Sequence, residues 1–193
     1  NGSGQLGLGN TTHQTTWQPS SLPNGARAKR VACGPLHTAV VTEEGTLLVC
    51  GQNRGGQLGL GNTTNQNAWQ ASPLPDGVRA PAVACGCWHT VVLTEVGALL
   101  VCGRNDSGQL GLGHENNQTT PQMIVPSGVQ RIAAGFDHAF YVKQDGSLWG
   151  MGKNDQGQLG TGDQTDRNQS VLIMPSGVRQ VAAGRDHTLV VKT

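Results

Sequence analysis

Residues 53–61 read Asn-Arg-Gly-Gly-Gln-Leu-Gly-Leu-Gly, and their Gly-Gln-Leu-Gly core recurs three more times in the chain. The four copies are separated by 52, 52 and 49 residues. A second motif, Gly-x-x-His, recurs at spacings of 52, 49 and 49 residues. The two motifs keep step, which indicates one structural unit of roughly 50 residues repeated about four times. The motifs begin at Gly4, Gly56, Gly108 and Gly157, and at Gly34, Gly86, Gly135 and Gly184.

Each unit carries short apolar runs with the length and composition of β-strands, and no run has a helical period. In the first unit these runs are 31–33, 38–42 and 47–51, with Glu44 and Gly45 as a hairpin turn. A weaker fourth run lies around Trp17, Trp69, Gln122 and Val171 in the successive copies. Repeated four-stranded units with glycine-rich corners are typical of β-propeller blades. We predict an all-β chain, residues 1–193, with units 1–52, 53–104, 105–153 and an incomplete 154–193.

Charge and hydropathy exclude several classes of protein. Charged residues are 13% of the chain, and 13 Lys and Arg against 12 Asp and Glu leave a net charge of +1. A charge-rich disordered tail is excluded, and so is the basic field that nucleic-acid binding requires. No apolar run approaches the roughly 18 residues of a membrane span. We therefore expect no membrane partner, and nucleic acid is disfavoured.

The five cysteines indicate a reducing compartment. Their number is odd and they form no Cys-x-x-Cys pair, so we expect them to be reduced and buried in an intracellular protein, cytoplasmic or nuclear. Six Asn-x-Ser/Thr triplets point toward the secretory pathway instead. The triplets lie in repeated Asn- and Thr-rich loops, so repetition explains them without glycosylation. The cysteines are Cys33, Cys50, Cys85, Cys87 and Cys102.

The combined pattern resembles the RCC1 repeat, named for the regulator of chromosome condensation. Its three parts here are Asn-x-x-Gly-Gln-Leu-Gly-x-Gly, Val-Ala-x-Gly-x-x-His-Thr and Gly-x-Leu-x-x-x-Gly, and they cover essentially the whole chain. The resemblance implies a ring of seven blades, commonly closed by strands from both termini. Departures are local: Cys50, Cys102 and Met151 stand where the family usually has Trp, and Ala139 stands where the other copies have Thr.

Alignment of the copies makes the two chain ends informative. Asn1 aligns with Asn53, after the third strand, and Thr193 aligns with Glu43, before it. The third strand therefore occurs three times and the other parts four times. We expect a partial ring that further sequence of the same protein completes. A second copy or another chain could complete it instead, and a closed four-blade ring with one incomplete blade stays open as an alternative.

The four motif histidines could be taken for metal ligands or catalytic groups. Equivalent positions in rotated blades form a wide ring, whereas a zinc ion needs ligands at about 2 Å. We expect the histidines and the motif glycines to be structural, with no catalytic residue, metal or cofactor. The histidines are His37, His89, His138 and His187, and the glycines are Gly34, Gly86, Gly135 and Gly184.

The two residues between each motif Gly and His vary from copy to copy, which is typical of a binding surface on a repeated scaffold. Trp and Arg are the residue types that dominate binding hot spots. The candidate partner-binding residues are Leu36, Trp88, Phe136, Asp137, Arg185 and Asp186. Ordinary corner packing is the alternative interpretation. Arg27, Lys29 and Arg30 form a second candidate, a short basic patch, for which the alternative is a solvated face.

These observations favour a non-enzymatic protein-interaction or scaffold module. The family resemblance also implies a second hypothesis, a guanine-nucleotide exchange factor for a small Ran-like GTPase. In the family's exchange factor, acidic residues on propeller loops contact the GTPase, and Asp137 and Asp186 match such a corner by position. That protein also uses a protruding wedge from one blade, and no insertion of that kind interrupts the repeat spacing here. Chromatin binding is a third hypothesis, which the net charge of +1 disfavours.

Overall fold

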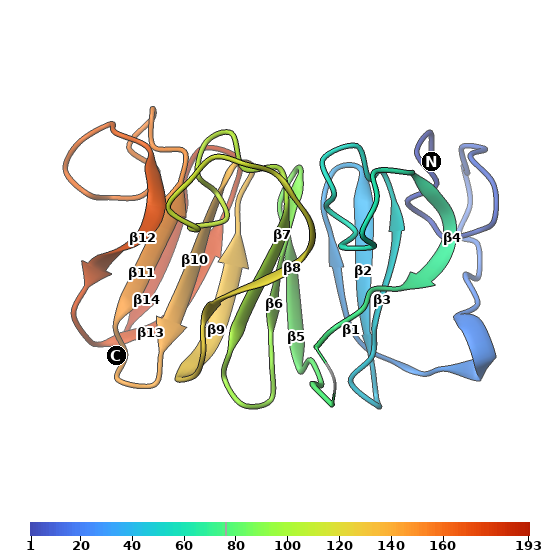
Figure 1. The fold of residues 1–193 in the computed structure, drawn as a ribbon, viewed down its shortest axis with the longest axis horizontal. Helices are drawn as coiled ribbons and strands as arrows, with labels where there is room; N and C mark the ends of the chain where they lie inside the picture. Colours follow the sequence, from blue (N-terminus) through green and yellow to red (C-terminus); the bar gives the residue numbers. More distant parts are fainter. Residues whose placement is uncertain (76) are drawn as a thin grey trace.

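The computed structural model describes residues 1–75 and 77–193, and its sheets repeat along the chain as the sequence predicts. Three four-stranded antiparallel sheets are followed by a two-stranded one, as Figure 1 shows. The first sheet contains β1 (Ala28–Cys33), β2 (His37–Thr42), β3 (Leu47–Gly51) and β4 (Gln66–Ala71). The second contains β5 (Ala82–Cys85), β6 (His89–Leu93), β7 (Leu99–Gly103) and β8 (Gln118–Val125). The third contains β9 (Val129–Ala134), β10 (His138–Lys143), β11 (Leu148–Gly152) and β12 (Arg167–Met174). The last pairs β13 (Val178–Ala183) with β14 (Thr188–Lys192), and a 3-10 turn spans Pro23–Gly25.

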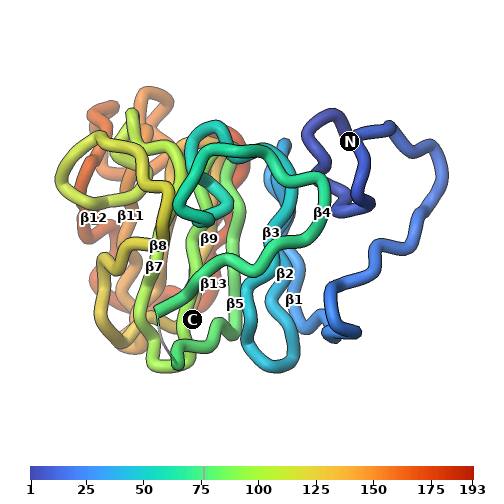
Figure 2. The backbone as a smooth tube through the Cα atoms, turned by 45° about the vertical axis from the view of Figure 1, so that its right-hand side comes forward, coloured from blue at the N-terminus to red at the C-terminus, as the bar shows by residue number. Residues whose placement is uncertain are grey.

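The four sheets stand side by side as blades of a partial propeller. The first strands of successive blades pack on one another, β1 on β5, β5 on β9 and β9 on β13. Figure 1 shows these strands in that order across the molecule, with the two termini at opposite ends. The tube in Figure 2 follows the same succession from the blue N-terminal segment to the red last blade. The prediction of all-β propeller blades is confirmed, and the chain forms an open arc instead of a closed four-blade ring.

The outer strand of each blade comes from the following repeat unit. β4, which starts at Gln66, pairs with β3 across this boundary, and β8 and β12 repeat the arrangement. The prediction of a fourth strand around Trp17 is wrong, because no described strand lies there. Its pairing partner would be the third strand of another blade, which is not among the described sheets.

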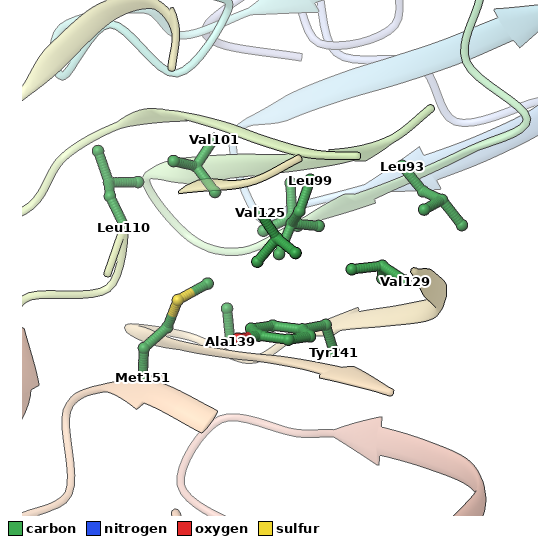
Figure 3. Close-up of a cluster of buried hydrophobic side chains, with 10 residues drawn as sticks. Leu93, Leu99, Val101, Leu110, Val125, Val129, Ala139, Tyr141 and Met151 are labelled. Carbon is green, nitrogen blue, oxygen red and sulfur yellow. The ribbon is translucent and has the colours of Figure 1, made fainter. Parts of the chain in front are cut away.

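The hydrophobic core lies between blades, in three separate clusters. One unites Ala39 and Val41 of β2 with Val92 and Leu100 of the second blade. Side chains alternate across a strand, so each blade offers one apolar face to each neighbour. Figure 3 shows the middle cluster, in which Leu99 and Val101 of one blade face Tyr141 and Met151 of the next. The third cluster joins blades three and four around Phe140, Leu148 and Leu159.

The Gly-Gln-Leu-Gly loop is held by its own buried polar side chains. Asn53 accepts a hydrogen bond from the Leu58 amide through Oδ1 at 2.9 Å and donates through Nδ2 to the Asn62 carbonyl at 2.9 Å. Gln57 accepts from the Gly55 amide at 2.9 Å. Asn105 and Asn154 hold the same loop in the third and fourth units. These hydrogen bonds from buried Asn and Gln side chains to the loop backbone therefore hold the repeated glycine-rich loop in its conformation.

Candidate partner-binding face

The motif glycines allow the blades to approach one another. A Cβ at Gly34 would lie 2.2 Å from the Gly86 carbonyl oxygen, and one at Gly135 would lie 2.7 Å from the Gly184 oxygen. The imidazole of the same motif also lies close to the glycine, since a Cβ at Gly86 would lie 2.1 Å from Cε1 of His89. Only glycine fits between an imidazole and a neighbouring backbone at this separation.

The motif histidines hydrogen-bond across the blade joints. Nε2 of His37 lies 2.9 Å from Oγ1 of Thr90, whose hydroxyl donates to the Gln57 carbonyl at 2.6 Å. A threonine hydroxyl has one proton, so the imidazole is the donor to Thr90. The joint between blades three and four repeats this arrangement, with His138 at 3.3 Å from Thr188 and Thr188 donating to Gln158 at 2.8 Å. His187, whose outer side carries no further described blade, is exposed.

The joint between blades two and three departs from this pattern. His89 is fully buried, and neither ring nitrogen has a hydrogen-bond partner. The residue that would supply the hydroxyl is Ala139. Burial lowers the pKa of His37 and of His138 to about 4 and that of His89 to about 3. The three buried imidazoles are therefore neutral near pH 7.

The predicted corner residues divide into two sets. The first residue of each pair lines a hollow of about 250 Å³ around which the first strands of the four blades converge. These residues are Pro35, Cys87, Phe136 and Arg185. The Arg185 guanidinium lies 4.8 Å from the Phe136 ring centre, a cation–π contact between two blades. The Cys87 amide donates to the Phe136 carbonyl at 2.9 Å, which ties the second corner to the third.

In the first three blades the second residue of each pair is beside the loop that follows the third strand, because its carbonyl accepts a hydrogen bond from the amide of Gln52, Arg104 or Lys153. The Arg104 guanidinium lies 5.9 Å from the Trp88 ring centre, and Arg104 also pairs with Asp106. Leu36, Trp88 and Asp137 are half-buried, and Asp186 is exposed beside Arg185 at 3.3 Å. We call the surface made by these corners and the adjoining loop residues the corner-loop face. It comprises Leu36, Trp88, Arg104, Asp106, Phe136, Asp137, Lys153, Asp155, Arg185 and Asp186.

Charges of both signs act on one another across this face. Burial raises the pKa of Asp137, which the Arg104 charge opposes and the Asp106 charge reinforces. Lys153 lies 3.1 Å from Asp155, and this hydrogen bond raises the pKa of the lysine. The loop residues Arg104, Asp106, Lys153 and Asp155 were not among the predicted site residues. Their positions within three residues of the Gly that ends the third strand were the signal that could have identified them.

The basic patch lies apart from the corner-loop face, at the start of β1. Arg27, Lys29 and Arg30 are all exposed, and Arg27 lies 3.6 Å from Glu43. Ion pairs of this exposure contribute little to stability, and the role of the patch stays a prediction.

The cysteines follow the prediction with two corrections: Cys85 is half-buried and Cys33 is exposed. All five are free thiols, and Cys50, Cys87 and Cys102 are buried. Cys33 is exposed, because it lies on the outer face of the first blade, against which no described blade packs. Burial raises the pKa of Cys87 to about 11 and those of Cys50 and Cys102 to about 12, so these thiols are poor nucleophiles.

Within residues 1–75 and 77–193, no group of three or more His, Cys, Asp and Glu side chains is arranged to hold a metal ion. The same residues include no helix with the length and apolar character needed to cross a membrane.

The fold and the joints together define a repeat propeller built from His–Thr–carbonyl links and glycine corners. The chain belongs to the regulator of chromosome condensation (RCC1) repeat family, whose profile matches residues 1–41, 44–93, 96–142 and 145–191. The match includes all four Gly-x-x-His motifs, so the resemblance drawn from the sequence is confirmed.

Curated relatives match part of the chain. The ultraviolet-B receptor UVR8 of Arabidopsis thaliana is 36% identical over 130 residues, which are 67% of this chain and 30% of the receptor. The secretion-regulating guanine nucleotide exchange factor of Bos taurus is 44% identical over 115 residues, which are 59% of this chain and 25% of that protein. The matched regions span less than a third of either relative.

Solved structures of this family share the arc. Human WBSCR16 is 29% identical with a TM-score of 0.84, and the match covers 98% of this chain and 52% of that chain. Prp20p of Saccharomyces cerevisiae is 22% identical with a TM-score of 0.87, over 100% of this chain and 51% of that one. Each comparison shows the same partial propeller, about half of the larger structure.

Proposed function

We propose that the chain is a non-enzymatic protein-interaction module that binds a protein partner through the corner-loop face. The observation that carries the proposal is the cation–π contact beside the hollow where the four first strands converge, in which the Arg185 guanidinium lies 4.8 Å from the Phe136 ring centre. A propeller corner needs only a turn there, and small residues would satisfy it. Large aromatic and cationic side chains at successive corners supply the area and directional contacts typical of binding hot spots.

The packing beneath the corner-loop face supports the same proposal. The corners are fixed by the buried His–Thr links and by the Cys87–Phe136 backbone hydrogen bond, so little conformational freedom is lost on binding. The surface charges alternate in sign, with Arg104, Lys153 and Arg185 beside Asp106, Asp137 and Asp186. Such a surface selects a partner by matching its charge pattern, since a partner of a single sign meets repulsion as well as attraction.

The test compares two sets of substitutions in the 193-residue chain. Trp88→Ala with Arg185→Ala removes one aromatic and one cation from the corner-loop face. Val96→Ala, at an exposed hairpin, is the matched control. Proteins retained from a cell extract by the wild type and by Val96→Ala are expected to be lost with the double variant, at an unchanged thermal midpoint. Retention by the double variant would contradict the proposal, and early unfolding with retained binding would assign Trp88 to packing.

A second candidate, guanine-nucleotide exchange, is favoured by one observation. The Bos taurus relative that is 44% identical over 115 residues bears the name of an exchange factor. Asp137 and Asp186 would be the acidic contacts to a small GTPase. The measurement is the release of a fluorescent nucleotide from small GTPases, Ran-like ones included, with and without the chain. Accelerated nucleotide release that Asp137→Asn abolishes would support exchange activity. An unchanged release rate with every GTPase would contradict exchange activity and leave the scaffold role as the remaining proposal.

A further inference from the structure

The first strands of the blades carry positive charge and no negative charge. Successive blades pack through their first and second strands, so β1, β5, β9 and β13 form the inner wall of the arc (Figure 1). No Asp or Glu lies in these four strands. Their cations, which we call the inner-wall cations, are Lys29, Arg30, Arg131 and Arg179.

A β-bulge places these cations at one level of the inner wall. The pairing register shifts near the start of β1, β9 and β13, so each of these strands has one extra residue there. In β9, Val129 and Ile132 both contact the core cluster between blades two and three, so the two residues between them leave that face. We call these two residues the bulge pair, and both are exposed in all three strands. The bulge pairs are 29–30, 130–131 and 179–180.

The second blade leaves room between the cations of its neighbours. Pro81 and Ala82 occupy the positions equivalent to a bulge pair, and neither has a polar side chain. Every inner-wall cation therefore belongs to a bulge pair, and small residues separate the pair of the first blade from that of the third.

The inner-wall cations lack the carboxylate partners that other cations of the molecule have. Among residues 1–75 and 77–193, no carboxylate oxygen lies within 4.0 Å of any of the four. The chain has 13 Lys and Arg and 12 Asp and Glu, so the molecule outside these four cations is net acidic. Like charges on neighbouring strands repel one another, and a bound anion relieves that repulsion. The cations that do pair with a carboxylate are Arg27, Arg104, Lys153, Arg167 and Arg185.

We propose that the inner-wall cations bind a compact, soluble polyphosphate anion on the concave side of the arc. The anion lies at the level of the bulge pairs and contacts cations of the first, third and fourth blades. Three of the four cations are arginines, whose planar guanidinium groups match phosphate oxygens with two parallel hydrogen bonds. The site lies at the start of the first strands, whereas the corner-loop face lies beyond their other ends.

The arrangement of the cations favours a compact anion over an extended acidic peptide. A peptide that ran along the inner strands would meet the cations at one level only. Protein partners also need large aromatic or apolar anchors, and the four inner strands contain no aromatic residue. The inner wall therefore offers charge at one level and little else that a protein segment could use.

The test measures the binding of inositol hexakisphosphate to the 193-residue chain by isothermal titration calorimetry at physiological salt. We expect saturable binding at one site per chain. Arg30→Gln and Arg131→Gln should each weaken binding about tenfold, because each removes a charge-assisted contact. The matched control is Arg54→Gln, which removes an exposed cation outside the inner wall and should leave the affinity within about twofold.

A variant with an added cation keeps the test independent of any loss of folding. Gln180→Arg completes the bulge pair of the last blade and should tighten binding severalfold. Gln70→Arg, which adds a cation at an exposed position of β4, should not. Thermal midpoints identify any variant that is unfolded.

Three results would overturn the proposal. The first is the absence of binding, and the second is equal weakening by Arg54→Gln and Arg131→Gln, which would mean general attraction of charge. The third is equal affinity for a hexaglutamate peptide, which would assign the inner wall to acidic protein segments. The corner-loop face is a separate surface, so none of these results bears on the scaffold proposal.

Discussion

A single hydroxyl distinguishes the three blade joints. Thr90 and Thr188 connect an imidazole to a backbone carbonyl, whereas Ala139 leaves His89 buried and unpartnered. A buried donor without a partner costs free energy, because it has lost its water and gained nothing in return.

Restoring that hydroxyl should therefore stabilise the middle joint. Ala139→Thr is compared with Ala139→Val, which has nearly the same shape and no hydroxyl. We expect the free energy of unfolding of the threonine variant, measured by urea titration, to be about 1 kcal/mol higher than that of the valine variant. Thr90→Ala should lower stability by about 1–3 kcal/mol, since it leaves His37 in the state of His89. Equal stability of the Thr and Val variants would show that His89 does not engage the restored group.

The depressed imidazole pKa values predict a loss of stability in mild acid. His37 and His138 have folded values of about 4 and His89 of about 3, against 6.5 for the free side chain. The unfolded chain binds protons first as the pH falls below 6.5, so unfolding becomes more favourable down to the folded pKa values. Each unit of separation is worth about 1.4 kcal/mol.

The measurement is the urea midpoint between pH 7.5 and pH 5. We expect it to fall steadily below pH 6.5. A flat profile in this window would mean that the buried imidazoles are hydrated and titrate normally.

At the scale of the element, two equivalent tryptophans have opposite surroundings. The Trp69 indole N–H donates to Ser20 Oγ at 2.8 Å, and its ring covers Gly7, where a Cβ would lie 2.4 Å from Nε1. Trp17 is fully exposed, and no described strand includes it or pairs with its segment.

Substitution of the two residues should have different effects. Trp69→Ala is expected to cost about 2 kcal/mol and to release the N-terminal segment to proteolysis, because it removes half-buried ring area and a hydrogen bond. Trp17→Ala should stay within about 0.5 kcal/mol of the wild type. Limited proteolysis and urea titration give both quantities. A comparable loss in both variants would mean that Trp17 packs against the molecule in solution.

These elements also show how far the sequence could predict the fold. The spacing of Gly-Gln-Leu-Gly and Gly-x-x-His located the strands and the blades, because a repeat must place equivalent residues equivalently. It could not show that β4 belongs to the first blade although it lies in the second unit, since pairing across a unit boundary leaves no local signal. The positions of Arg104 and Lys153 after the third strand mark them as loop residues, but their contacts with the corners required the structure, and so did the exposure of Cys33 on the outer face of the first blade.

At the scale of the whole molecule, stability should follow position along the arc. The described strand packing joins each blade to its neighbours along the arc, so the free energy of unfolding is approximately a sum of blade and joint contributions. The second blade contributes to two core clusters, whereas the last blade has two strands and contributes to one. Its outer face exposes Leu189 and Val191, at 69% and 48%.

We therefore expect hydrogen exchange to rank the blades. The amides of β6 and β7 should exchange only on global unfolding, and those of β13 and β14 should exchange by local opening of the last blade at a much lower free energy. Val190→Ala, at the third core cluster, should accelerate exchange in β13 and β14 and leave β6 and β7 unchanged. Mass spectrometry of peptic fragments resolves the two regions. Uniform protection along the chain would show that the arc unfolds as one cooperative unit, which requires joints stronger than the blades they connect.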